Sequence, residues 1–283
     1  MDSTKRQVVR IIEPQSVIEG AGVRLKRSIA GAALDYLDPF LLFDHFGSDN
    51  PRDYLPGFPM HPHRGIETVT YMLAGAVTHR DSLGNAGTIG AGDVQWMTAG
   101  RGIMHEEMPE PVDGRMAGFQ LWVNLPARLK MTKPRYQEIL SAALPEVRRA
   151  DGAVVRVIAG SVGDVRGPVT DIFAEPEYLD VTLPAHASFE QPVTRGHNAF
   201  AYIFEGGGTF GDGTAALGSP KMIILGDGDL VRAQAGASGL RCLLVSGAPL
   251  GEPIARYGPF VMNTREEILQ ALADLRDGTF VQA

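Results

Sequence analysis

Short apolar stretches separated by turn residues run along most of the chain. Residues 7–46 have the pattern of short strands, with turns at Glu19-Gly20 and near Gly31, and further apolar runs follow at 119–126 and 153–159. Runs of this length, bounded by glycine, proline, asparagine and aspartate, are typical of β-strands. The pattern predicts an all-β protein built from many short strands.

The second half of the chain repeats the first half in outline. Residues 174–250 again follow the order strand, turn, strand, and the glycine-rich stretches at 205–208 and 226–229 correspond to turns of the first half. We therefore predict two β-barrels in tandem, an N-terminal one over residues 1–136 and a C-terminal one over residues 137–283.

The end of the chain has the pattern of a helix. Thr264 and Glu267 have the spacing of a capping box, and Gly278 is a stop signal. Apolar residues recur between them at helical spacing: Ile268, Leu269, Leu272 and Leu275. We predict one helix that ends the second barrel and packs against the outside of a barrel.

Potential metal ligands form two short clusters in the first half. One is His61-Pro62-His63 and the other is His105-Glu106-Glu107. Side chains at positions i and i+2 of a strand point to the same face, so each cluster offers a pair of donors, and Glu106 faces away. Two such strands facing each other across a barrel bring three imidazoles and one carboxylate to one ion.

This donor set indicates a transition metal. Imidazole with carboxylate suits Fe, Mn, Ni, Co or Zn, and coordination positions remain open for oxygen or a substrate. The predicted ligands are His61, His63, His105 and Glu107. Their paired spacing sets them apart from lone polar residues on a sheet surface.

Glu67 shares strand parity with His63, so we expect it on the same face as the ligands. A carboxylate in that place commonly fixes a histidine tautomer or binds an arginine. Arg64 and Arg101 are its candidate partners.

Three other histidines are not predicted to be metal ligands. For Asp44-His45 a place in the pocket and a place at a strand end are equal alternatives. His79 follows a turn, and we expect it in a solvated hairpin. His197 stands where the second half would need an H-x-H pair, so we predict that the C-terminal barrel carries no metal.

The composition of the chain bears on nucleic-acid binding, disulfide bonds and membrane insertion. The chain of 283 residues has a formal net charge of −7 and one cysteine, Cys242, in an apolar run that suits a buried thiol. The negative net charge indicates no basic surface for binding nucleic acid. A single cysteine allows no internal disulfide, which fits a reducing compartment. No apolar run approaches the ~20 residues of a membrane helix. We expect a cytoplasmic protein that contacts neither nucleic acid nor membrane directly.

Three stretches resemble the pirin family: HPHRGIETV at 61–69, GDVQWMTAGRGIMHEEMP at 92–109 and FQLWVNLP at 119–126. The first two also resemble the two cupin motifs. The resemblance covers nearly the whole chain and implies two cupin (jelly-roll) barrels, with the metal ligands in the N-terminal one. It implies the same four ligands, His61, His63, His105 and Glu107, although Glu106 occupies a position where a small residue is usual.

The resemblance also implies a function. Pirin-like proteins include some with quercetin 2,3-dioxygenase-type activity, which implies a metal-dependent dioxygenase acting on a flavonol or similar enediol with O₂. Fe(II) is the first expectation, with Zn, Ni, Mn, Co or Cu as alternatives, and Glu107 is a candidate base for the substrate hydroxyl. The alternative is a metal-sensing regulator that binds a protein partner, and a third reading is an isomerase or an inactive binding module.

Overall fold

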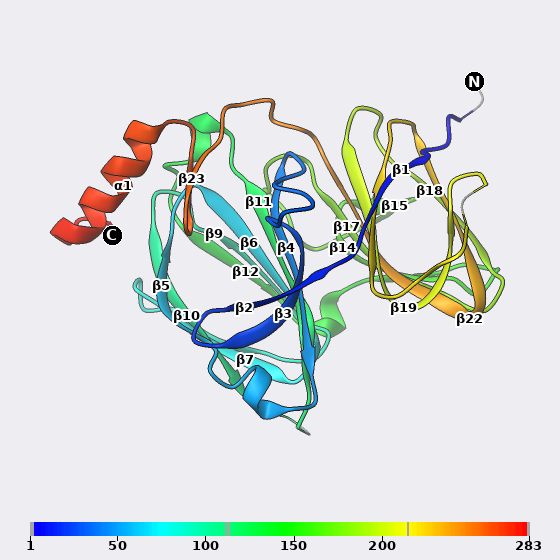
Figure 1. The fold of residues 1–283 in the computed structure, drawn as a ribbon, viewed down its shortest axis with the longest axis horizontal. Coiled ribbons are helices and arrows are strands. Elements are labelled where there is room, and N and C mark those ends of the chain that lie inside the picture. Colours follow the sequence, from blue (N-terminus) through cyan, green and yellow to red (C-terminus); the bar gives the residue numbers. More distant parts are fainter. Residues whose placement is uncertain (1–2, 111, 113, 214, 282–283) are drawn as a thin grey trace. The chain divides into compact units, whose positions relative to one another are not determined.

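The computed structural model describes residues 3–110, 112, 114–213 and 215–281. These residues form an all-β protein with one α-helix near the C-terminal end, as predicted (Figure 1). The chain divides into two compact units. We call Gln15–Ser141 with Leu250–Ala283 the histidine unit, and Met1–Pro14 with Ala142–Pro249 the duplicate unit.

The histidine unit contains two antiparallel sheets. The seven-stranded sheet has the order β12-β9-β6-β11-β4-β3-β2, and its strands are Arg135–Ile139, Val94–Thr98, Ile66–Ala74, Met116–Asn124, Phe40–Ser48, Val23–Ile29 and Gln15–Glu19. The four-stranded sheet has the order β5-β10-β7-β8, and its strands are Phe58–His63, Ile103–Glu110, Ala76–Asp81 and Ala86–Ile89. A short hairpin, β23 (Ala255–Tyr257) with β24 (Phe260–Met262), completes the unit.

Apolar side chains from both sheets share one buried core. Val77 and Ile89 come from the four-stranded sheet, and Leu25, Met72 and Met116 come from the seven-stranded one. Alternate residues of each strand therefore face the partner sheet, which is the arrangement of a β-sandwich or jelly roll.

The duplicate unit is built on a nine-stranded sheet. Its main path is β1-β21-β19-β22-β17-β14-β13, with strands Val8–Ile12, Lys221–Leu225, Asn198–Phe210, Leu230–Gly247, Glu177–Leu183, Val154–Ala159 and Glu146–Arg148. The strand β18 (Ser188–Pro192) pairs with β22, and β20 (Leu217–Gly218) pairs with β19. A separate ladder joins β15 (Ser161–Val162) to β16 (Val165–Arg166).

Short 3₁₀ helices occur at Pro51–Asp53, Ala127–Leu129 and Ser141–Ala143.

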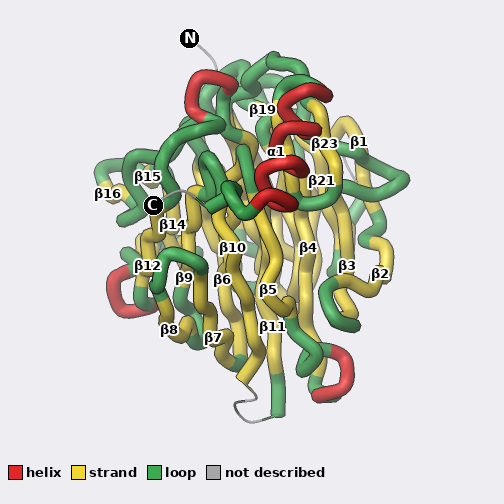
Figure 2. Tube along the Cα trace, turned by 90° about the vertical axis from the view of Figure 1, so that its left-hand side faces the viewer, coloured by secondary structure: helices red, strands yellow, loops and turns green. Residues whose placement is uncertain are grey.

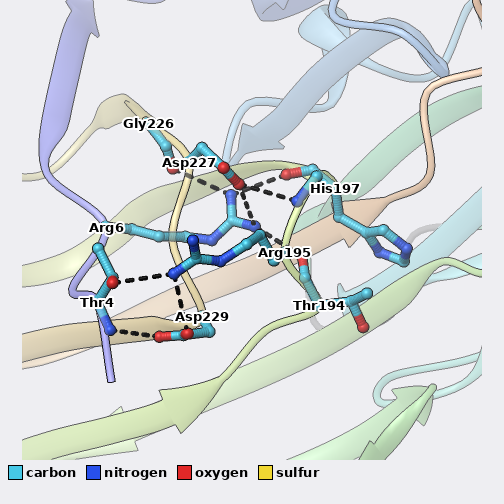
Figure 3. A network of polar contacts seen from close by, with 9 residues as sticks. Thr4, Arg6, Thr194, Arg195, His197, Gly226, Asp227 and Asp229 are labelled. Carbon is cyan, nitrogen blue, oxygen red and sulfur yellow. Dashed lines mark hydrogen bonds and ion pairs between the residues drawn. The ribbon is translucent and has the colours of Figure 1, made fainter. Parts of the chain in front are cut away.

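The first residues of the chain belong to the duplicate unit because Arg6 anchors them there. The Arg6 side chain is 1% exposed, and its guanidinium donates to the carbonyl oxygens of His197 (2.8 Å), Gly226 (3.0 Å) and Thr194 (2.8 Å) (Figure 3). Beside it, Asp229 accepts a hydrogen bond from the backbone of Thr4. The strand β1 then pairs with β21, which places the N-terminal segment at the edge of this sheet.

The division of the chain therefore differs from the expected boundary between residues 136 and 137. The segment before Gln15 joins the duplicate unit, and the segment from Leu250 onward joins the histidine unit. Sequence periodicity does not reveal where these two terminal segments belong. Their placement depends on contacts between residues about 200 positions apart, such as Arg6 with His197.

The predicted helix is α1 (Arg265–Asp277), and its caps are as expected. Glu267 N donates to Thr264 Oγ1 (3.2 Å), Thr264 N donates to Glu267 Oε2 (2.9 Å), and Gly278 has a left-handed φ of 75°. Its buried face centres on Ile268 and Ala271. The helix contacts β23 and β24, and Figure 2 shows it beside β23. No described helix has the length and apolar character needed to span a membrane.

Candidate metal centre

Two neighbouring strands carry the three histidines that the sequence singles out. The antiparallel strands β5 and β10 pair His61 with His105 and His63 with Ile103. Because alternate residues share a face, both residues of the H-x-H pair and His105 point inward. One ring nitrogen from each of the three lies within 4.8 Å of the others, and the Nε2 atoms of His61 and His63 are 3.1 Å apart.

The two deeper histidines are electrically neutral at ordinary pH. His63 is 3% exposed and His105 is 1% exposed. Burial, reinforced by His61, lowers the pKa of His63 to about 3, although the carbonyl of Pro259 opposes this shift. Burial followed by the charge of His63 holds the pKa of His105 well below its usual range. Neutral imidazoles have the lone pairs that a metal requires.

The environment of His105 fits a metal ion. Both of its ring nitrogens are buried, and neither has a hydrogen-bond partner among the described residues. Leaving a buried polar atom unpaired costs roughly 1–3 kcal/mol, and metal coordination would remove that cost for one of the two nitrogens. The donor set and the unpaired nitrogens therefore both suit a transition metal.

Glu107 lines the same cavity but stands outside the tight group of histidine nitrogens. The register of β10 on β5 shifts between His105 and Glu107, so Glu107 pairs with Phe58. Its Oε1 lies 3.2 Å from Thr70 Oγ1. Burial raises the pKa of Glu107, and nearby His61 only partly offsets this shift. Glu106 does not line the cavity.

A cavity of about 540 Å³ opens beside the histidines, within the histidine unit. Most of its wall is apolar and comes from both sheets: Val23, Leu25, Leu42, Phe46, Phe58, Val77, Met116 and Trp122. Polar groups also face it, among them Thr70, Gln120 and Arg256. An apolar wall with a few polar groups is typical of sites for small organic ligands.

Of the pair Asp44-His45, Asp44 lines the cavity and His45 does not. Arg27 binds Asp44 through Nε (2.9 Å) and Nη2 (2.7 Å), and its Nη1 binds Glu19 (2.6 Å). Burial raises the pKa of Asp44 more than Arg27 lowers it. His45 instead packs against Phe119, with ring centroids 4.8 Å apart.

Glu67 does not share the face of the ligands, so that expectation is wrong. Thr70 lines the cavity, and Glu67, an odd number of residues away on β6, faces the opposite side, where it accepts a hydrogen bond from Thr98 (2.7 Å). The parity changes at Gly65, which has a φ of +83° and breaks the strand. The guanidinium of Arg64, one of its two candidate partners, binds Asp274 instead (2.6 Å).

His79 is buried, where a solvated hairpin was expected. It is 2% exposed, its Nε2 lies 2.5 Å from Glu138 Oε1, and its ring stacks on Tyr136 at 5.7 Å. These partners lie on β12, so local sequence around residue 79 carries no signal for this contact.

The C-terminal segment also contributes to the cavity, which the sequence did not reveal. Arg256, Gly258 and Pro259 line it. The approach is close at Gly65, where an added Cβ would lie 2.0 Å from the carbonyl oxygen of Val261. Only a residue without a side chain lets the segment pass this near to the ligand strand.

Known proteins are similar to this chain in sequence and in fold. The family model described as Pirin matches residues 22–123, and the Pirin C-terminal cupin domain matches residues 178–281. A pirin-like protein of Caulobacter vibrioides is 47% identical over 276 residues, which cover 97% of this chain and 99% of that protein. Pirin of Rattus norvegicus is 41% identical over 284 residues, which cover 98% of this chain and 94% of that protein.

Solved structures of other proteins are similar to the fold of this chain. The crystal structure of a quercetin 2,3-dioxygenase from Acinetobacter baumannii has a TM-score of 0.90 at 36% identity and covers 98% of this chain and 99% of its own. A bacterial pirin from Escherichia coli, in complex with nickel(II), shares the fold with a TM-score of 0.67 at 19% identity, covering 85% of this chain and 99% of its own. With both family models matched and relatives similar along their whole length, the chain belongs to the pirin family.

Proposed function

We propose that the protein is a metal-dependent dioxygenase of the quercetin 2,3-dioxygenase type, with a flavonol or similar enediol as substrate. The observation that carries this proposal is the meeting of three clustered imidazoles with a mostly apolar cavity. The likeness to a structure named quercetin 2,3-dioxygenase supports the same reaction class.

His61, His63, His105 and Glu107 would hold the metal. Two of the imidazoles are neutral and buried, so they offer nitrogen donors without competition from protons. When bound, an ion such as Fe(II) supplies a centre at which an organic substrate and O₂ meet and exchange electrons.

Glu107 has a second role in this proposal. Its carboxylate faces the cavity, and burial raises its pKa, which makes it a stronger base toward a substrate hydroxyl. Thr70 Oγ1, at 3.2 Å, orients the carboxylate. The proton would move from the hydroxyl oxygen of the substrate to a carboxylate oxygen of Glu107.

The apolar wall would bind the aromatic body of the substrate and exclude water. A volume of about 540 Å³ lies within the range of roughly 300–1,000 Å³ that is usual for ligand pockets. Trp122 and Phe58 offer aromatic faces on which a planar ligand can stack.

The test is a turnover assay with defined metals. Metal-free protein is loaded with Fe(II), Ni(II), Mn(II), Co(II) or Cu(II), quercetin is added in air, and loss of flavonol absorbance and release of carbon monoxide are recorded. We expect turnover with at least one metal and its loss, by about 100-fold or more, in His63→Asn and His105→Asn. His186→Asn, an exposed histidine of the duplicate unit, is the matched control and retains full activity.

Absence of turnover with every metal, in protein shown by elemental analysis to be loaded, would remove the dioxygenase proposal. Metal-dependent capture of a protein partner by such inactive protein would then favour the regulatory alternative.

A further inference from the structure

One arginine that lines the cavity comes from the far end of the chain. Arg256 lies on β23, is exposed, and shares the cavity with His61 and His63. An exposed residue that also lines a cavity stands at its opening. Arg256 is therefore reached by a ligand as it enters.

Buried contacts hold this hairpin in place. The ammonium group of Lys130 donates to the carbonyl oxygens of Val261 (2.9 Å) and Gly65 (2.9 Å) and to Asn124 Oδ1 (2.8 Å). The backbone of Val261 donates to the carbonyl of Arg64 (3.1 Å). The hairpin that presents Arg256 is thus fixed to the strand that ends at His63.

The guanidinium of Arg256 is placed by two contacts. Its Cζ lies 5.1 Å from the ring centroid of Trp122, and its Nη1 donates to the carbonyl oxygen of Leu41 (3.1 Å). The ring of Trp122 in turn meets that of His63 nearly perpendicularly, with centroids 5.0 Å apart. Trp122 thus contacts both the arginine and a proposed metal ligand.

Arg256 keeps free hydrogen-bond donors, and Asp35, Asp44 and Glu19 act on its charge only at longer range. Within the described part of the chain it forms no ion pair, and its Nε and Nη2 have no hydrogen-bond partner. Arg27, the other arginine of the cavity, differs, because Asp44 and Glu19 occupy its donors. An arginine that stacks on an aromatic ring and keeps free donors is well suited to bind a planar ligand that carries an anionic oxygen.

We propose that Arg256 is a specificity-determining residue that selects aromatic substrates with a second acidic oxygen, a phenolate or a carboxylate, in addition to the oxygen pair that faces the histidines. This inference rests on the proposed function and names the substrate class more narrowly. Trp122 stacks on the ring of the substrate, and the free guanidinium donors bind its ionised oxygen.

The test is direct binding to zinc-loaded protein, because Zn²⁺ has no redox chemistry and leaves the ligand intact. Calorimetry compares quercetin with 3-hydroxyflavone, which keeps the 3-hydroxy-4-keto pair and lacks the other hydroxyl groups. In Arg256→Gln we expect the Kd for quercetin to rise about tenfold and the Kd for 3-hydroxyflavone to change less than twofold. Arg256→Lys, which keeps the charge, recovers part of the loss.

The matched control is Arg24→Gln, which removes the same charge from an exposed arginine outside the cavity. It leaves both affinities unchanged. An equal loss for both ligands in Arg256→Gln, or no loss for either, overturns the role of Arg256 while the proposed function stands. If neither flavonol binds the wild-type protein, both proposals fall together.

Discussion

His63 illustrates how a single residue links the proposed metal centre to stability. In the unfolded chain its pKa is the ordinary value of 6.5, and in the folded metal-free protein burial lowers it to about 3. The unfolded chain therefore binds the proton more tightly. The contribution of neutral His63 to the free energy of unfolding is therefore complete above pH 6.5. It is lost progressively as the pH falls toward 3.

We predict that acidification from pH 7 to pH 5 lowers the free energy of unfolding of the metal-free protein by about 2 kcal/mol through His63 alone. His63→Gln has no such titration, so its stability curve is flatter over this range by the same amount. Urea unfolding at each pH measures the difference. His186→Gln, at an exposed position, follows the wild-type curve. Parallel curves for His63→Gln and wild type would contradict the assignment of a neutral, buried His63.

At the scale of elements, the helix α1 supports the ligand strand. Arg64 follows His63 directly, is 1% exposed, and pairs with Asp274 of the helix at 2.6 Å. Its guanidinium also lies 4.4 Å from the ring centroid of Phe280. Removing one partner of a buried ion pair leaves the other charge uncompensated, which is strongly destabilising.

We predict that Asp274→Asn lowers the free energy of unfolding by about 2–3 kcal/mol and weakens metal binding several-fold, because the backbone next to His63 loses its support. Asp277→Asn is the control, since among the described residues Asp277 pairs with exposed Arg276 of the same helix and with no other residue. Thermal unfolding and competition with a chelator measure the two effects. Equal behaviour of both variants would show that the helix does not position the ligand strand.

The strands and the helix could be predicted from sequence where the signal is local. The H-x-H spacing placed His61 and His63 on one face correctly, and the capping box located α1. Parity failed for Glu67, because it cannot be carried across the break at Gly65, whose φ of +83° resets the faces. Nor could sequence reveal Arg256, because no local pattern predicts which distant segment closes a cavity.

At the scale of the whole molecule, the two ends of the chain are exchanged between the units. Residues before Gln15 complete the duplicate unit and residues from Leu250 complete the histidine unit. The predicted fold class, two cupin barrels with a terminal helix, is confirmed. The order of strands within the barrels was not accessible to periodicity, since pairings such as β1 with β21 join distant parts of the chain.

We predict that Arg6→Gln destabilises the duplicate unit by about 3 kcal/mol, because three backbone carbonyls lose a charged donor in a buried place. Arg10→Gln, at an exposed position of β1, is the control and costs less than about 0.5 kcal/mol. Hydrogen exchange of β19 and β21 reports the loss, and metal binding at His61, His63 and His105 is unaffected. Unchanged exchange in these strands would exclude the anchoring role of Arg6.

The exchange of chain ends has a consequence for biosynthesis. A ribosome that has made the first 141 residues has added all three clustered histidines to the chain, yet the hairpin that lines the cavity beside them lies beyond residue 250. A nascent chain therefore exposes an unfinished cavity while residues 142–249 of the duplicate unit are translated, and separate expression of residues 15–141 leaves that cavity without its C-terminal wall.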